Sequence, residues 1–440
     1  MALKDNLKRQ FRDWRIRIFT VAWITYALFY ITRANLSIAI PGINQEFGYS
    51  KTMLGSIGSA LFATYAIGQF TNGQLGDKFG ARKLVTIGII ISALANLAFG
   101  FTATITAMVL LWAINGYFQS TGWPLNVKTI ANWFPLERRG TITGLYGSCY
   151  QAGNALSWLL SGYLASNYGW RQVFWVPALI FGLSSLLFYF GIRNSPESVG
   201  LPSIEEFEDP SATALSSEKQ IAKRSETKAV EEEHLGFSFT LRRTFGNPKI
   251  WIVGIAFIFL DVIRYGFFIW APTYLFEVQK AEISIAAYKT MVIPIAGSLG
   301  AISAGWLTQK HFGSRRGPPV TIMLVCLGTL AWLYPKIPTD NWVLGLVCLA
   351  MIGYFTYGPH VTMVAAIPMD FGTRKGAASA TGFIDGLGYI GAFLTSIISG
   401  MLIDNYGWGA AFNFWIASAF IAAGLMVTLW KYKPQREKYI

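Results

Sequence analysis

The chain alternates long apolar stretches with short polar ones. A helix needs about 20 predominantly apolar residues to cross the hydrocarbon core of a bilayer. Apolar stretches of this kind recur twelve times, and we predict a transmembrane helix at each. They lie at 18–40, 53–75, 83–102, 104–130, 141–165, 172–192, 250–273, 285–308, 320–336, 342–368, 377–403 and 411–430. The predicted fold class is therefore an all-α membrane protein with twelve transmembrane helices.

One long segment interrupts this alternation. Residues 194–248 begin with a polar, charge-mixed run, which is typical of a mobile linker. The segment separates the first six apolar stretches from the last six. We predict an N-terminal six-helix bundle at 1–193, a linker at 194–248 and a C-terminal six-helix bundle at 249–440.

The two halves repeat each other. SGYLASNYGW at 161–170 returns as SGMLIDNYGW at 399–408, and Arg33 returns as Arg264 at nearly the same offset. Parallel repeats of this kind predict two bundles related by a pseudo-twofold axis along the membrane normal. Small residues are dense in the second, fifth, eighth and eleventh spans, which favours close and adjustable helix contacts.

The net charge of +13 is distributed unevenly about the predicted spans. On the side of the termini lie 28 of the 36 Lys and Arg residues, which is the positive-inside pattern. We therefore predict cytoplasmic termini and a cytoplasmic linker, and the charge does not indicate a nucleic-acid partner. All three cysteines fall in apolar spans, without the spacing of a metal site.

Arg33 lies near the middle of the first predicted span. A charged side chain there costs about 2.5–3.5 kcal/mol, so it usually faces a cavity and has a function. Tyr26, Tyr30 and Arg33 are spaced to share one helix face, which suits an anion because a guanidinium presents paired donors. The alternative is a structural arginine that pairs with a buried acid.

Arg264 is the corresponding charge in the seventh span. Pseudo-twofold symmetry predicts that Arg33 and Arg264 face each other at the interface of the two bundles. An anion that bridges them would draw the halves together. Asp261 stands three residues before Arg264, within reach of an intrahelical ion pair.

The motif GQLGDKFGARK at 73–83 resembles the signature loop of the major facilitator superfamily, and so does the twelve-span repeat. The resemblance implies a charge latch on the cytoplasmic side, formed by Asp77 and Arg82 of the motif with Arg138 and Arg139. In the second half Gln309 replaces the acid. The alternative is a solvated basic loop that only sets the topology.

Over nearly its whole length the chain is similar to the organophosphate:phosphate antiporters, which include the bacterial glycerol-phosphate and hexose-phosphate exchangers. The matching stretches are YxxxYxxRxN (26–35), GYFQSTGWPLNVKTIANWF (116–134), SPESVGLPSIEEF (195–207), RYGFFIWAPTYL (264–275), YGP (357–359) and GFIDGLGYIGAF (382–393). The resemblance implies that Arg33 and Arg264 are the phosphate ligands. It also places a wall of hydrogen-bonding phenols around them, namely Tyr26, Tyr30, Tyr65, Tyr357 and Tyr389.

The chain departs from the glycerol-phosphate branch at several of these positions. Gln69 replaces a lysine, Tyr150 replaces a histidine, and Asp385 is an added acid inside a span. We expect these three side chains to bind the substrate and to set its specificity.

Added acids also raise the question of proton coupling. If Asp261 and Asp385 are ionised, they cancel the charge of the two arginines. Either the ligand carries less charge, or an acid takes up a proton as the anion binds. Asp261, Asp385 and His360, the one histidine within a span, are the candidates for coupling. The alternative is that Asp261 only neutralises Arg264, and that His360 lies between helices.

The sequence therefore predicts a secondary transporter, not an enzyme, because it contains no nucleophile–base pair, metal cluster or phosphate loop. We expect exchange of a phosphorylated small organic molecule for inorganic phosphate, with no cofactor and no metal. The alternatives are a proton-coupled carboxylate symporter and a transporter-like sugar-phosphate sensor. We expect a monomer in the bilayer, most simply the bacterial inner membrane.

Overall fold

The computed structural model describes residues 2–208, 246–313, 315–368 and 374–432, and the regular elements in these ranges are all helical. The first half contains α1 (Ala2–Ile31), α2 (Asn35–Phe47), α3 (Lys51–Phe79), α4 (Ala81–Phe99), α5 (Ile105–Gln119), α6 (Gly122–Trp133), α7 (Leu136–Tyr168), α8 (Gln172–Gly191), η1 (Pro196–Val199) and α9 (Ile204–Glu208). The second half contains α13 (Pro248–Glu277), α14 (Ile283–Thr290), α15 (Val292–Lys310), α16 (Gly317–Leu333), η2 (Tyr334–Lys336), α17 (Trp342–Val361), the π-helical η3 (Thr362–Ala366), α19 (Arg374–Tyr406) and α20 (Trp408–Val427).

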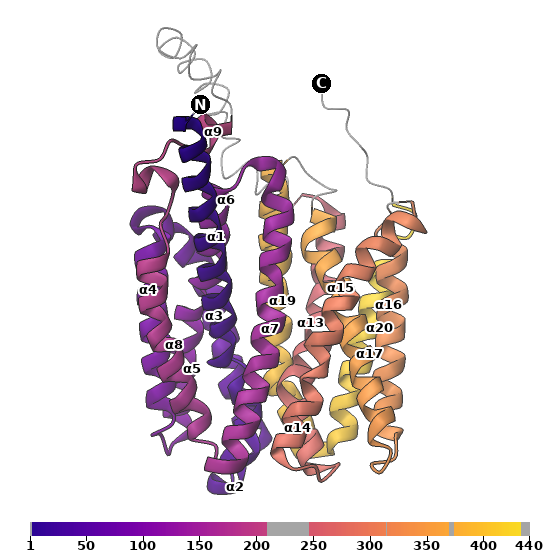
Figure 1. Cartoon of the computed structure of the whole chain (residues 1–440). Helices are drawn as coiled ribbons and strands as arrows, with labels where there is room; N and C mark the ends of the chain where they lie inside the picture. Colours follow the sequence, from indigo (N-terminus) through magenta and orange to yellow (C-terminus); the bar gives the residue numbers. More distant parts are fainter. Residues whose placement is uncertain (1, 209–245, 314, 369–373, 433–440) are drawn as a thin grey trace.

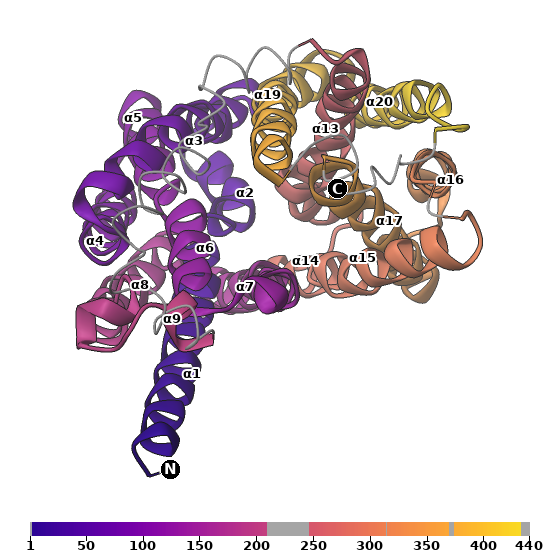
Figure 2. The same cartoon turned by 90° about the horizontal axis from the view of Figure 1, so that it is seen from above.

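The long helices form two groups that lie side by side. Seen from above, α1 to α8 gather in one group and α13 to α20 in the other (Figure 2). The groups meet through α3 with α19, α7 with α14 and α15, and α2 with α13. The start of α1 and the end of α20 lie on one side of the molecule, which we call the terminal side (Figure 1). We call the opposite side the far side.

Eight segments of the described residues are long and apolar enough to cross a membrane. They are Ala81–Phe99, Gln172–Gly191, Pro248–Glu277, Ile283–Thr308, Gly317–Lys336, Trp342–Ala366, Ala380–Tyr406 and Trp408–Val427. The spans predicted at 18–40, 53–75, 104–130 and 141–165 are not among them, because their helices are interrupted or carry more polar side chains. The total of twelve spans, and the domain boundaries at 193 and 248, stay predictions.

The first predicted span is interrupted at its charged residue. α1 ends at Ile31 and α2 begins at Asn35, with Arg33 in the turn between them. The carbonyl of Thr32 accepts hydrogen bonds from the side chains of Asn96 (3.2 Å) and Asn115 (2.9 Å) instead of continuing the helix. Side chains that insert into the helical hydrogen-bond ladder are a known cause of kinks. The prediction of one continuous helix over 18–40 is therefore wrong.

The start of the predicted mobile linker is ordered. Leu201 and Ile204 are buried, and the ring of Phe207 on α9 stacks on Phe11 of α1 at 4.0 Å between centroids. The prediction of a mobile linker is wrong for residues 196–208, because these apolar side chains pack on the extended first helix. Residues 209–245 lie outside the described part of the chain.

On the far side, hydrogen bonds join the two groups of helices. The carboxylate of Asp404 on α19 accepts from the backbone N–H of Lys51 (2.9 Å) and of Thr52 (2.7 Å), so it caps the start of α3. In the repeat, position 404 corresponds to Ser166, whose hydroxyl accepts from the N–H of Ser284 at 3.0 Å, at the start of α14. Each half therefore caps a helix of the other half, once with a charge and once without.

Glycines let these helices come close together. A Cβ at Gly55 of α3 would collide with the backbone carbonyl of Ser396 on α19, and one at Gly400 would collide with the carbonyl of Lys51. In the same region the hydroxyl of Ser396 donates to the carbonyl of Gly55 (2.7 Å), and that of Ser59 donates to the carbonyl of Phe393 (2.7 Å). The far side is therefore closed by close backbone contacts as well as by the two caps.

We predict that Asp404→Ala opens the far side. Loss of a helix cap costs about 0.5–2 kcal/mol, which shifts an equilibrium by roughly 2- to 30-fold. Spin labels at the far-side positions Phe101 and Asp340, in a background with the three cysteines replaced by serine, should report a larger share of long distances. Asn405→Ala is the matched control, because Asn405 bonds only within its own helix. An unchanged distance distribution in the Asp404 variant would contradict the assignment of Asp404 as a closing contact.

Candidate functional site

A cavity of about 330 Å³ lies between the two groups of helices. Side chains of both halves line it: Tyr26 and Tyr30 (α1), Tyr65 and Gln69 (α3), Trp123 and Val127 (α6), Thr143 and Tyr150 (α7), Arg264 and Tyr265 (α13), His360 (α17), Val364 and Ala365 (η3), and Thr381, Asp385 and Tyr389 (α19). Eight of the ten side chains predicted to bind substrate lie on this wall, together with His360. The remaining two, Arg33 and Tyr357, lie behind it.

Arg264 is the cavity's arginine, and it is already partnered. Its Nη1 donates to Oδ1 of Asp261 at 3.1 Å, as the spacing of the two residues predicts. The same Nη1 lies 2.9 Å from Nε2 of His360. A guanidinium only donates, so Nε2 of His360 is the acceptor and the imidazole is neutral in this arrangement. Asp261 is buried and does not line the cavity.

Two tyrosine rings support the Arg264 guanidinium. Its central carbon lies 4.6 Å from the ring centroid of Tyr265 and 5.3 Å from that of Tyr357. Such contacts favour a cation because the face of an aromatic ring is negative. Tyr357 therefore contacts the arginine from the protein interior, where it is buried.

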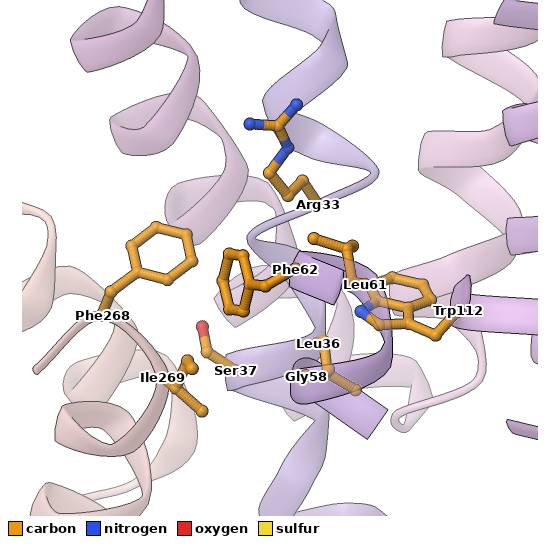
Figure 3. Close-up of a pocket in the computed structure, with 9 residues that line it drawn as sticks. All are labelled: Arg33, Leu36, Ser37, Gly58, Leu61, Phe62, Trp112, Phe268 and Ile269. Carbon is orange, nitrogen blue, oxygen red and sulfur yellow. The ribbon is translucent and has the colours of Figure 1, made fainter. Parts of the chain in front are cut away.

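Arg33 lies behind the cavity wall and borders a second pocket. That pocket is small, with a volume of about 20 Å³, and is lined mainly by apolar groups, with Phe62 and Leu61 from one half and Ile269 and Phe268 from the other. The guanidinium points away from these side chains (Figure 3). It lies 4.9 Å from the ring centroid of Tyr30 and 4.6 Å from that of Tyr65, and both rings line the main cavity.

The structure therefore modifies the predicted two-arginine clamp. Arg264 lines the cavity, whereas Tyr30 and Tyr65 contact Arg33 from the cavity wall. Nη2 of Arg33 is buried and has no hydrogen-bond partner among the described residues. We expect a ligand in the cavity to reach this donor after movement of the two tyrosine rings, because both contact Arg33 and line the cavity. Helix spacing does not predict that Arg33 lies behind the wall, because Arg33 is in the turn at 32–34 and not on the face of α1 that carries Tyr26 and Tyr30.

Asp385 supplies the acidic side of the cavity. It lies on α19, one helical turn from Tyr389, and makes no hydrogen bond or ion pair with any described residue. The ring of Tyr389 contacts Tyr65 across the two halves, at 4.8 Å between centroids. Arg264 and Asp385 both line the cavity, so a ligand meets a guanidinium and a carboxyl group there.

Aromatic side chains that were not predicted complete the wall. Trp123 packs on Tyr26 at 5.4 Å and stacks on Tyr146 at 5.3 Å, and Tyr265 meets Phe62 of the other half at 4.6 Å. Trp123 lies in the matching stretch 116–134 and Tyr265 directly follows Arg264. Both residues lie in stretches that match the antiporter family, and this match could have identified them as wall residues, whereas helix-face spacing alone could not.

The predicted latch lies mostly beyond what the structure describes. The side chains of Asp77 and Arg139 are outside the described residues, and Arg138 is exposed. Arg82 donates from Nε to the carbonyl of Tyr189 at 2.6 Å, within its own half. The latch therefore stays a prediction. In the part of the chain that is described, no group of three or more His, Cys, Asp or Glu side chains has the arrangement of a metal site.

Comparison with known proteins places the chain among membrane transport proteins. A family model described as the Major Facilitator Superfamily matches residues 22–396. A probable hexose phosphate transport protein of Chlamydia trachomatis is 30% identical over 98% of this chain and 94% of its own length. A glycerol-3-phosphate transporter of Bacillus subtilis is 31% identical over 97% and 94%. The membrane sensor protein UhpC of Escherichia coli is 26% identical over 99% and 97%.

We predict that Asp261→Asn destabilises the ligand-free protein. Removing one partner of a buried ion pair costs about 3–5 kcal/mol, and we expect about 1–3 kcal/mol here because Arg264 keeps His360 and lines an open cavity. The melting temperature in detergent should therefore fall. Asp340→Asn, at an exposed loop position, should leave it unchanged. Equal melting temperatures for both variants would show that Asp261 does not stabilise Arg264.

Proposed function

The chain belongs to the Major Facilitator Superfamily and, within it, to the organophosphate:phosphate antiporters, and from this premise we propose that it exchanges a phosphorylated small organic molecule for inorganic phosphate. It is a multi-pass integral membrane transport protein, not an enzyme. Relatives that are similar over nearly their whole length are named as transporters of hexose phosphate and glycerol 3-phosphate. Their names support a phosphate ester as the substrate.

One observation carries the proposal: two guanidinium groups from equivalent positions of the repeat approach one tyrosine-rich cavity. Arg264 lines the cavity, and Arg33 lies directly behind Tyr30 and Tyr65. Burying an arginine in a membrane protein costs free energy, so such residues usually have a function. The paired donors of a guanidinium fit phosphate oxygens. The phenol groups of the wall are further hydrogen-bond donors for an anion and its organic part.

The arrangement suggests how an anion would couple the two halves. A phosphate that binds Arg264 competes with Asp261 for the guanidinium. Movement of Tyr30 and Tyr65 then exposes the unpaired Nη2 of Arg33. An anion held by both arginines joins α13 of one half to the turn between α1 and α2 of the other. Closure around the anion opens the far-side contacts, which gives alternating access.

The remaining features of the proposal follow from the charge pattern. The basic residues of the terminal side indicate that this side is cytoplasmic. We propose twelve spans in two six-helix bundles at 1–193 and 249–440, joined by a cytoplasmic linker at 194–248. The transporter then acts as a monomer in a bacterial inner membrane, and Asp77 with Arg82, Arg138 and Arg139 forms a latch on its cytoplasmic side.

Two observations favour alternative functions. Asp385 lines the cavity without a partner, and Asp261 and His360 both contact Arg264, so a proton-coupled symporter of organic anions is the second candidate. In this candidate Asp261, Asp385 and His360 exchange protons as the anion binds. The similarity to a membrane sensor protein supports a third candidate, which binds a sugar phosphate without turnover.

Phosphate exchange tests the leading proposal. Proteoliposomes that are preloaded with phosphate should take up labelled phosphate saturably. Arg33→Lys and Arg264→Lys should each reduce this exchange by at least about tenfold, because lysine keeps the charge but lacks the paired donors. Arg171→Lys is the matched control, since Arg171 pairs with Glu46 outside the cavity.

The outcomes separate the candidates. Absence of wild-type exchange, with the protein shown to be folded, would reject phosphate antiport. Uptake of organic acids under an imposed pH gradient would then support a symporter. Binding of a sugar phosphate without transport of any tested anion would support a sensor.

Asp385→Asn tests proton coupling separately. If Asp385 carries the coupled proton, the variant should lose pH-driven uptake, because an amide does not titrate in this range. Uptake of labelled substrate at equal and at unequal pH across the membrane measures this. Full retention of pH-driven uptake in the variant would exclude Asp385 from coupling.

A further inference from the structure

Buried amide side chains surround the turn that carries Arg33. Asn96 on α4, and Asn115 and Gln119 on α5, have no exposed surface. The pairs Asn115–Gln119 and Ser92–Asn96 are each spaced by four residues, so each pair shares one face of its helix. Both faces point at the turn, where Asn115 and Asn96 bind the carbonyl of Thr32.

Gln119 makes the contacts that reach the arginine itself. Its Nε2 donates to the hydroxyl of Thr32 at 2.9 Å and to the carbonyl of Phe29 at 3.1 Å. Its Oε1 accepts from Nε of Arg33 at 3.0 Å. Since Nε of an arginine only donates, the carbonyl oxygen of the amide has to face Arg33. One side chain thus binds both the backbone before the turn and the guanidinium.

The contact has a consequence for the charge and the direction of Arg33. The amide oxygen is neutral, so it orients the guanidinium without cancelling its charge. It uses only Nε, which leaves the two terminal nitrogens for a ligand, and Nη2 is the atom that has no partner in the described structure. Arg264 differs, because its Nη1 contacts a carboxylate and an imidazole.

We propose that Gln119 is a positioning residue that holds Arg33 ready for the anion, with its terminal nitrogens free and its charge uncompensated. The inference rests on the proposed phosphate exchange. The serine and asparagine side chains around Gln119 fix it in turn: Ser92 donates to Oδ1 of Asn115 at 2.5 Å and lies 3.4 Å from Nε2 of Gln119. Gln119 acts through Arg33 and does not line the cavity.

The test compares Gln119→Met with Asn72→Leu. Methionine fills a similar volume but does not hold Nε of Arg33. A hydrogen bond to a charged group contributes enough that its loss corresponds to about a tenfold change in affinity or more. We expect Gln119→Met to raise the KM for phosphate exchange about tenfold, with a smaller change in the maximal rate. Asn72→Leu removes buried hydrogen bonds to Tyr117 and Ser120 at the end of α5 without touching the turn, and should change KM by less than about threefold.

A second measurement separates positioning from general damage to the fold. Affinity for inorganic phosphate is measured by calorimetry on purified protein, for Gln119→Met alone and combined with Arg33→Lys. Lysine has no Nε, so the Gln119 substitution should have almost no effect in the Arg33→Lys background. An equal loss of affinity in both backgrounds would overturn the proposal, and so would equal KM changes for the Gln119 and Asn72 variants.

Further outcomes keep the two proposals distinguishable. If the wild type neither binds nor exchanges phosphate, the proposed function fails. If the wild type is active and Gln119→Met matches it, only the role of Gln119 fails. If Gln119→Met does not fold, Gln119→Glu replaces it, since it keeps an acceptor for Arg33 but adds a negative charge. Its affinity for phosphate should fall at least about tenfold, and an unchanged affinity would overturn the proposal.

Discussion

The site depends on how two guanidinium charges are kept inside a membrane protein. Burying each charge costs free energy, and each half of the chain stabilises its arginine through different contacts. Arg264 lies against a carboxylate, an imidazole and two tyrosine rings, whereas Arg33 lies against an amide oxygen and two tyrosine rings. The repeat has therefore kept the arginine and changed its surroundings. Arg264 therefore has a carboxylate partner, whereas the partner of Arg33 is a neutral amide.

This difference gives the two halves separate tasks in the proposed exchange. Arg264 lines the cavity, so an incoming anion meets it first and competes with Asp261. Arg33 does not line the cavity but contacts Tyr30 and Tyr65, which do, so the proposal includes a change in the wall before the anion binds Arg33. Because Arg33 sits in the turn between α1 and α2, a force on its side chain acts directly on the junction of two helices.

Much of this arrangement is readable from the sequence. The apolar stretches and the Arg264–Asp261 spacing correctly indicate helices and an ion pair. The break at 32–34 is not readable, because the hydrogen bonds that cause it come from Asn96 and Asn115, far away in the chain. The same holds for Gln119, whose role depends on a contact between residues 86 positions apart. Local periodicity predicts which side chains lie on the same face of a helix. It does not predict which side chains of a neighbouring helix contact that face.

The caps on the far side affect how easily the protein changes shape. Asp404 and Ser166 bind backbone amides at the starts of α3 and α14, rather than side chains inside an apolar core. Exposed helix starts are readily hydrated, so water replaces each cap when the contact separates. Opening therefore exchanges one set of hydrogen bonds for another and leaves no amide unsatisfied. In the proposed transport cycle, hydrogen bonds of this kind can be broken and re-formed in every turnover.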